Sequence, residues 1–265
     1  MTDPAEQPRQ PSPPERSSRR ALREIALVYV AVCVTTWLLT RLRHQPPFAD
    51  YVHLAVGGLF LITALKLAGR LPGGVERFGL SLGGLLEPSA EDVDEAPGPL
   101  GLFDLGRALW RALPSATREF AFALGVALLI FPPFVVGFYF WHAPSHAFHW
   151  APPPDLGSFA LAQFVVVALP EEAFFRGYLQ TRLEDVFPKR RRLLGSSLSV
   201  GAWIGSAALF ALIHFLVEGN PARLAVFFPG LLFGWLRARR GGIGASLTLH
   251  AGSNLLSEIL VRGWL

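Results

Sequence analysis

The chain has 265 residues, of which 51% are hydrophobic and only 17% are charged. These values exclude an intrinsically disordered chain, which needs low hydrophobicity and high charge. They also argue against an ordinary soluble domain, whose surface needs about a quarter charged residues. The formal charge of +4 comes from Lys and Arg that flank apolar blocks, a pattern typical of membrane proteins and not of nucleic-acid-binding proteins.

Seven segments are apolar enough to be considered as membrane spans, although the sixth is short. We therefore predict an all-α, polytopic transmembrane helical bundle of seven to eight spans. In chain order the segments are Leu22–Thr40, Tyr51–Gly69, Phe120–Trp141, Leu156–Leu179, Leu194–Val217, Leu224–Leu236 and Ile243–Leu260. Pro132 and Pro133 are expected to kink the third span, because proline removes a backbone hydrogen bond.

The distribution of Lys and Arg gives the orientation. With seven spans and a cytoplasmic N-terminus, eighteen of the 24 basic residues lie in inner segments and four in outer ones. Short cytoplasmic loops carry such an excess of positive charge. The sequence therefore predicts that the N-terminus is inside, and the apolar stretch after it has no small-residue cleavage site of a signal peptide.

Three parts of the chain are distinguished by composition. Residues 1–20 are rich in Pro and Arg and are expected to be a disordered cytoplasmic tail. Residues 21–155 hold the first spans and a long inner loop, 70–118, with an acidic stretch from Pro88 to Pro99 and a helix after it. Leucines at helical spacing from Leu102 to Leu113 predict that this helix is amphipathic and lies on the membrane surface. Residues 156–265 hold the remaining apolar segments, and the family resemblance described below implies that they form a catalytic membrane domain.

The fourth span contains two adjacent carboxylates, Glu171 and Glu172, and an arginine, Arg176. Ionisable groups inside a membrane are expensive and are usually functional. Glu172 and Arg176 are four residues apart, so they share a helix face and can pair. Glu171 lies about 100° around the helix and is the freer carboxylate. A purely structural ion pair is the alternative, but it leaves Glu171 unexplained.

Two later spans add histidines. His214 follows Phe210 by one helical turn in the fifth span, and His250 precedes Asn254 by one turn in the seventh. Each group by itself is compatible with interhelical hydrogen bonding. Taken together they suit hydrolysis of an amide: a buried glutamate as general base, a histidine beside it, and two donors for an oxyanion. His, His and Glu also form a usual catalytic zinc set, although the H-E-x-x-H motif is absent.

The three motifs, Glu-Glu-x-x-x-Arg, Phe-x-x-x-His and His-x-x-x-Asn, follow one another on successive apolar segments. In this the sequence resembles the CPBP family of intramembrane proteases, which contains type II CAAX prenyl endopeptidases and bacterial relatives, some tied to bacteriocin self-immunity. The likeness covers roughly residues 156–260. It implies that Glu171 and His214 activate water and that His250 and Asn254 stabilise the oxyanion. Glu172 is then part of the same site, and Arg176 and Phe210 support it.

The resemblance implies a helical membrane endopeptidase that cleaves membrane-anchored or lipid-modified substrates. Family members have been described both as glutamate-type and as metal-dependent enzymes. In the second case Glu171, His214 and His250 would be the ligands of a divalent metal such as zinc. A composition rich in Ala, Arg, Gly and Pro favours a bacterial inner membrane, with lipids as partners and no nucleic acid.

Two other functions stay open at this stage. A proton-coupled transporter or channel could use Glu171 and His214 as a relay, although it has little use for Asn254, which cannot titrate. A non-catalytic scaffold or immunity factor could keep the motifs for packing alone. Replacing Glu171 by Gln separates this last function from catalysis, because the change preserves shape and removes the base.

Three further features of the sequence indicate a function less clearly than these motifs do. His142, His146 and His149 could share a helix face and bind a metal, but the prolines around them argue against a helix. Two small-residue motifs, Gly201-x-x-x-Gly205 and Gly230-x-x-x-Gly234, are expected to seat helices within the chain. Cys33 is the sole cysteine, which excludes an internal disulfide.

Overall fold

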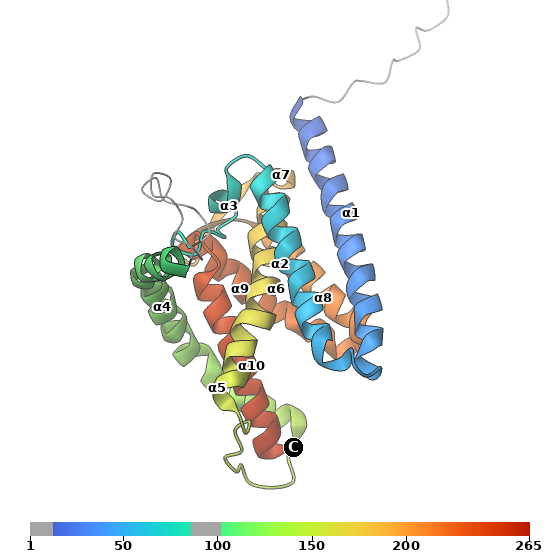
Figure 1. Ribbon diagram of the computed structural model, residues 1–265, viewed down its shortest axis with the longest axis vertical. Helices are drawn as coiled ribbons and strands as arrows, with labels where there is room; N and C mark the ends of the chain where they lie inside the picture. The colour runs from blue at the N-terminus through green and yellow to red at the C-terminus, as the bar shows by residue number, and fades with distance from the viewer. Residues whose placement is uncertain (1–12, 86–101) are drawn as a thin grey trace, which may run out of the picture.

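The computed structural model describes residues 13–85 and 102–265, and these form a bundle of helices with one small β-hairpin (Figure 1). The longer helices outside the fourth predicted span are α1 (Pro13–Arg41), α2 (Val52–Arg70), α4 (Leu102–His142), α8 (Val200–Glu218), α9 (Phe227–Arg240) and α10 (Gly244–Trp264). The shorter pieces are η1 (Leu42–His44), η2 (Ala49–Tyr51), α3 (Gly74–Arg77) and η6 (Pro221–Val226). The all-α membrane bundle expected from the sequence is thus what the chain forms.

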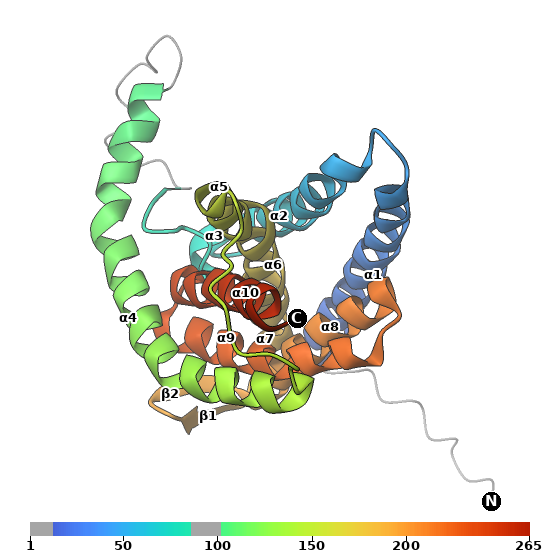
Figure 2. The same ribbon diagram turned by 90° about the horizontal axis from the view of Figure 1, so that it is seen from below.

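The fourth predicted span is one continuous helical stretch with changing geometry. It runs through α5 (Leu156–Ala162), η4 (Gln163–Ala168), α6 (Leu169–Glu172), η5 (Ala173–Leu179) and α7 (Gln180–Val186), of which η4 and η5 are π-helical. This stretch, called the central helix below, contacts α2, α8, α9 and α10. Figure 2 shows it in the middle of the bundle, with α4 curving around the outside.

Five helical segments among the described residues are long and apolar enough to cross a membrane. They are Ser17–His44, Ala49–Arg70, Gly106–His142, Leu156–Val186 and Val200–Glu218. The sixth and seventh predicted spans correspond to α9, with 14 residues, and α10, with 21 residues, and these are not among the five. At a rise of 1.5 Å per residue, α9 reaches only about two thirds of a 30 Å hydrocarbon core.

Several predicted boundaries differ from the structure. Helix α1 begins at Pro13, inside the segment 1–20 that was expected to be disordered. The surface helix predicted from Leu102 to Leu113 and the third span are one 41-residue helix, α4. The central helix continues to Val186, beyond the predicted end at Leu179. Residues 1–12 and the acidic stretch within 86–101 lie outside the described residues.

The start of the predicted fifth span is not helical. Residues Arg190–Leu193 and Ser196–Ser199 form antiparallel strands β1 and β2, with Arg190 opposite Ser199 and Leu193 opposite Ser196. Ser199 then caps α8, because its hydroxyl accepts a hydrogen bond from the amide of Ala202. The hairpin turns the chain from the central helix into α8, and α8 begins six residues later than predicted.

The bundle has two apolar clusters. The larger one joins α1, α2, the central helix and α8, and its aromatic centre contains Phe60, Phe174, Phe175, Tyr178 and Phe210. The smaller one joins α4, α9 and α10 around Phe233, Leu236 and Leu249. The central helix packs against α2 and α8 in the first cluster and against α9 and α10 beside the second. Its middle turns are therefore held from both sides.

The small-residue motifs pack helices of this chain together, as expected. A Cβ atom on Gly230 would lie 3.4 Å from the side chain of Ala207 on α8, and one on Gly234 would lie 2.8 Å from Oε1 of Gln180 on the central helix. A Cβ atom on Gly201 would lie 2.7 Å from the ring of Phe187. The close approach of α9 to α8 and to the central helix depends on these glycines.

Candidate active site

The middle of the central helix departs from regular α-helical geometry. Pro170 has no amide N–H, so it cannot donate the bond that the carbonyl of Val166 would receive in an α-helix. This carbonyl lies against α2, where a Cβ atom on Gly57 would be only 2.6 Å from its oxygen. The π-helical segments η4 and η5 lie on either side of the pair Glu171 and Glu172. Such segments are frequent at functional sites.

Glu172 and Arg176 lie in a sealed environment. Both side chains are fully buried, and Arg176 Nη1 lies 3.5 Å from Glu172 Oε1. The guanidinium carbon of Arg176 is 4.1 Å from the ring centre of Phe210 and 5.3 Å from that of Phe233. The cation is thus held by two aromatic rings as well as by the carboxylate. This group, Glu172, Arg176, Phe210 and Phe233, is called the sealed cluster below.

His250 links the sealed cluster to Glu171. Its Nδ1 lies 2.9 Å from Oε1 of Glu172, and its Nε2 lies 3.7 Å from Oε2 of Glu171. Its ring is stacked on Phe233, with 4.8 Å between centroids and an angle of 15°. Because the carboxylate of Glu172 accepts, we assign a proton to Nδ1. His250 is therefore fixed in position and orientation by the buried carboxylate of Glu172 and the ring of Phe233.

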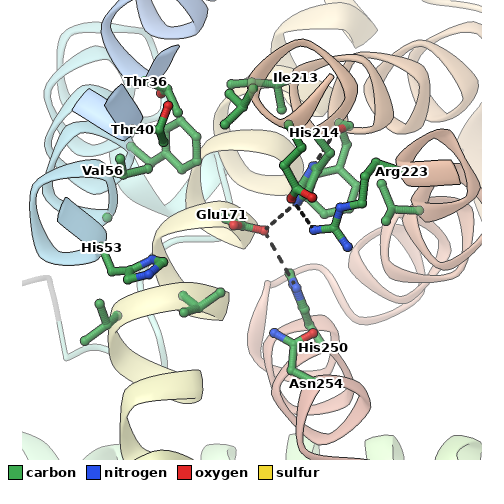
Figure 3. A pocket seen from close by; sticks show the side chains of 18 of the residues that line it. Thr36, Thr40, His53, Val56, Glu171, Ile213, His214, Arg223, His250 and Asn254 are labelled. Carbon is green, nitrogen blue, oxygen red and sulfur yellow. Dashed lines mark hydrogen bonds and ion pairs between the residues drawn. The ribbon is translucent and has the colours of Figure 1, made fainter. Parts of the chain in front are cut away.

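His214 approaches Glu171 from the other side. Its Nε2 lies 4.0 Å from Oε2 of Glu171, and its Nδ1 lies 2.8 Å from the backbone carbonyl of Phe210 (Figure 3). A carbonyl only accepts hydrogen bonds, so Nδ1 carries the proton and Nε2 of a neutral ring is free to accept one. The separation of 4.0 Å is too long for a direct hydrogen bond and suits a bridging water.

Asn254 lies one turn after His250, and both line the cavity next to Glu171. One N–H of the Asn254 amide donates to Oε1 of Gln163 at 2.9 Å. Its second N–H is not used by any hydrogen bond among the described residues. Gln163 is the first residue of η4, so the irregular part of the central helix also sets the orientation of Asn254.

These side chains share a cavity of about 400 Å³, within the usual range for ligand sites. Six parts of the bundle form its walls: α1, α2, the central helix, α8 with η6, α9 and α10. The polar residues in its lining are Thr36, Thr40, Arg43, His53, Gln163, Glu171, His214, Glu218, Arg223, His250 and Asn254. In Figure 1 the helices α5 and α10 extend further down than the loop joining α1 to α2, so this end of the bundle is stepped.

Glu171 and His214 come from different parts of their helices. Glu171 is in the middle of the 31-residue segment Leu156–Val186, whereas His214 lies near the end of α8. The structure brings Oε2 of Glu171 and Nε2 of His214 within 4.0 Å. It also brings together His250 with both glutamates, and Phe210 with His214 at a ring distance of 4.5 Å.

Several residues of the site were not predicted from the sequence, among them the cavity residues Thr36, Arg43, His53 and Arg223 and two partners of predicted residues, Gln163 and Phe233. Gln163 is an uncharged polar residue in an apolar span, a signal that could have been noticed. Phe233 carries no such signal, because an aromatic residue in an apolar segment is ordinary. Only the folded arrangement shows that its ring stacks on His250.

A metal site was also considered. Glu171, His214 and His250 are chemically a suitable donor set for zinc, but within residues 13–85 and 102–265 no group of three His, Cys, Asp or Glu has the spacing of a metal site. That statement includes His142, His146 and His149, of which the last two have ring centroids 5.5 Å apart. If a metal is bound, Glu171, His214 and His250 would hold it; the chemistry below is derived from the side chains alone.

A comparison with protein-family models matches residues 153–256 to the family described as type II CAAX prenyl endopeptidase Rce1-like. This segment, less than half of the chain, is similar to that family. The resemblance to CAAX-type membrane proteases is thereby confirmed, and the Rce1-like segment contains Glu171, His214, His250 and Asn254. Neither the comparison with curated proteins nor that with solved structures finds a match. The apolar helices and the similarity to this family point to a membrane protein.

Proposed function

We propose that the protein is an intramembrane endopeptidase that hydrolyses a peptide bond of a membrane-anchored or lipid-modified substrate. One observation carries the proposal: Oε2 of Glu171 lies within 4.0 Å of Nε2 of both His214 and His250, on the wall of one cavity. A carboxylate and two imidazoles that converge on one point can hold and deprotonate a water molecule.

Water is activated between Glu171 and His214. The free Nε2 of His214 and the carboxylate of Glu171 both accept hydrogen bonds from a water placed between them. Glu171 takes one proton as the water oxygen bonds to the carbonyl carbon of the substrate. When the carbon–nitrogen bond breaks, Glu171 returns this proton to the leaving nitrogen. The products are a carboxylic acid and an amine.

The oxyanion is stabilised by His250 and Asn254. Nε2 of His250 lies on the side of Glu171, 3.7 Å from its Oε2, while Nδ1 lies 2.9 Å from Glu172. In the proposed step an N–H at Nε2 and the second N–H of Asn254 are the donors on the cavity side. Donors fixed in advance toward a developing negative charge are worth about 2.7–4 kcal/mol each. Glu172 supports this step by holding Nδ1 of His250.

The placement in the membrane follows the charge distribution. We propose seven to eight spans, with α9 and α10 completing the bundle as tilted or partial spans. The N-terminus faces the cytoplasm of a bacterial cell, because the basic inner segments, among them Lys189–Arg192, then lie on the cytoplasmic side. Lipids and a membrane-anchored substrate are the partners, and nucleic acid is not.

The test compares the wild type with Glu171→Gln in liposomes. Both are given fluorogenic peptides with and without a lipid anchor, including a farnesylated CAAX peptide. We expect turnover to fall by about 10³-fold, because the variant keeps the shape and loses the base. The matched control is Glu258→Gln, an exposed glutamate on α10 paired with Arg262, which should retain full activity.

Two further arms decide the mechanism and the function. A strong zinc chelator should leave the wild-type rate unchanged, and a reversible loss would instead favour a metal enzyme. The membranes of cells that express either variant are also compared by mapping of protein termini. New termini that occur only with the wild type are expected. Equal peptide rates together with identical termini would reject the hydrolase and favour a scaffold.

A further inference from the structure

The cavity is partly built by α1, which lies outside the Rce1-like segment. Thr36 of α1 lines the cavity, and only 4% of this residue is exposed. Its hydroxyl oxygen is buried and has no hydrogen-bond partner among the described residues. Thr40, one turn later, differs in this respect, because its hydroxyl donates to the carbonyl of Trp37 at 2.9 Å.

Thr36 faces the catalytic groups across the cavity. Figure 3 shows Thr36 and Thr40 on one side and His250 and Asn254 on the other, with Glu171 between them. His53 and Val56 of α2 continue the wall on the side of Thr36. A peptide that places its scissile bond over Glu171 therefore passes this wall, and its main chain comes next to Thr36.

An unpaired buried hydroxyl weakens the folded state. Valine has nearly the same shape as threonine and would fill the same space without an unsatisfied polar atom. The hydroxyl of Thr36 thus contributes nothing to the fold that valine would not, and Thr36 lines the cavity where a ligand would lie. A hydrogen-bond acceptor on the ligand accounts both for the unpaired hydroxyl and for the position of Thr36 at the cavity.

We propose that the α1–α2 hairpin is a substrate-binding wall in which the hydroxyl of Thr36 donates a hydrogen bond to a main-chain carbonyl oxygen of the peptide substrate. This inference rests on the proposed endopeptidase function. A main-chain carbonyl is present in every peptide, so this contact fixes the position of the chain over Glu171 without selecting a side chain. Any preference of the α1–α2 hairpin for particular substrate side chains then comes from the other residues of this wall.

The experiment compares Thr36→Val with Thr36→Ser, which keeps the hydroxyl, and with Thr35→Val, a neighbouring threonine outside the cavity lining. The substrate is the fluorogenic peptide that the wild type cleaves fastest. For Thr36→Val we expect KM to rise about three- to tenfold, the value of one neutral hydrogen bond, with kcat within about twofold. Thr36→Ser should stay close to the wild type, and Thr35→Val should match it.

Stability separates binding from a structural role. The melting temperature of Thr36→Val should equal or exceed that of the wild type, since the change removes an unsatisfied group. A fall of more than about 3 °C would show that the hydroxyl serves the fold, and would overturn the proposal. An unchanged melting temperature with an unchanged KM would overturn it as well.

A second readout identifies the partner. Peptides in which one amide at a time is replaced by an ester carry a weaker carbonyl acceptor at a known position. When the ester stands at the position that Thr36 contacts, Thr36→Val should no longer raise KM. The hydrogen bond from Thr36 is already weakened in that peptide, so its removal has little further effect. An effect that is the same for every ester would contradict a main-chain contact. If Glu171→Gln is inactive while Thr36→Val is normal, only this inference fails; if Glu171→Gln equals the wild type, the proposed function fails too.

Discussion

Two regions of the central helix, one position apart in sequence, differ completely in environment. Glu172 and Arg176 are fully buried in the sealed cluster, whereas the side chain of Glu171 is 16% exposed and lines the cavity. The rotation of about 100° per residue in a helix produces this separation. Two identical side chains thereby have different neighbours: Glu172 contacts Arg176 and His250, and Glu171 lines the cavity, where the proposed mechanism uses it as the base.

The two regions are coupled through a single ring. His250 has one nitrogen on Glu172 and the other toward Glu171. His250 therefore carries the orientation that Glu172 sets to the wall of the cavity. Changes at Glu172 or Arg176 should lower stability and activity together, whereas a change at Glu171 should affect activity alone.

The largest effect should follow from breaking the sealed cluster. Arg176→Met leaves Glu172 buried without its cation, and loss of one partner of a buried pair costs about 3–5 kcal/mol. His250 remains as a partner of Glu172, so we expect the lower part of this range, with a marked loss of activity. The measurement is thermal unfolding in detergent together with peptide turnover.

Arg262→Met is the control, since it breaks an exposed pair with Glu258 on the surface of α10. It should have almost no effect. If Arg176→Met lowers stability no more than Arg262→Met does, the distinction between the two regions is refuted.

A smaller effect should come from the contact that shapes the cavity side. In Gly57→Ala the new methyl group would lie 2.6 Å from the backbone carbonyl of Val166, which cannot move away as a side chain could. We expect a loss of about 1–3 kcal/mol as α2 and the central helix separate. Gly58→Ala, where a Cβ atom would meet nothing within 4 Å, is the matched control. Equal stability of the two variants would contradict the close contact.

The smallest effect is expected at the stacking partner of His250. Phe233→Leu keeps an apolar side chain but removes the parallel ring at 4.8 Å. We expect kcat to fall by about tenfold with little change in KM, since a loosened His250 loses alignment with the oxyanion and not contact with the substrate. Phe228→Leu, on the exposed side of α9, is the control. A rise in KM alone would show that Phe233 acts on binding.

The sequence predicted the partners within each helix, because helical spacing is a local property. The pairing of Glu172 with Arg176 follows from a spacing of four residues, and so does the common cavity position of His250 and Asn254. Contacts between helices, such as His250 with Glu172, could not be predicted in this way. They depend on how far each helix is shifted along its neighbour.

The helix ends were predicted least well, and the reason is electrostatic. Hydropathy ended the central helix at Leu179 because charged residues follow. In the folded chain Arg182 pairs with Glu24 of α1 at 2.7 Å and with Asp185 at 2.6 Å. Paired charges of opposite sign can be accommodated within a helix, so both helices continue past the apolar segment. A hydropathy profile cannot predict this, because it scores each charged residue separately.

The π-helical segments allow the central helix to lose one residue without a change in the direction of the side chains that follow. A π turn holds one more residue than an α turn, so each segment is equivalent to an α-helix that has gained an insertion. Loss of one residue from Gln163–Ala168 would convert this segment into a regular α turn, and the residues after it would keep their angular positions. Glu171 would stay at the cavity and Glu172 in the sealed cluster. The same loss in a regular helix would rotate both glutamates by about 100° and exchange their environments.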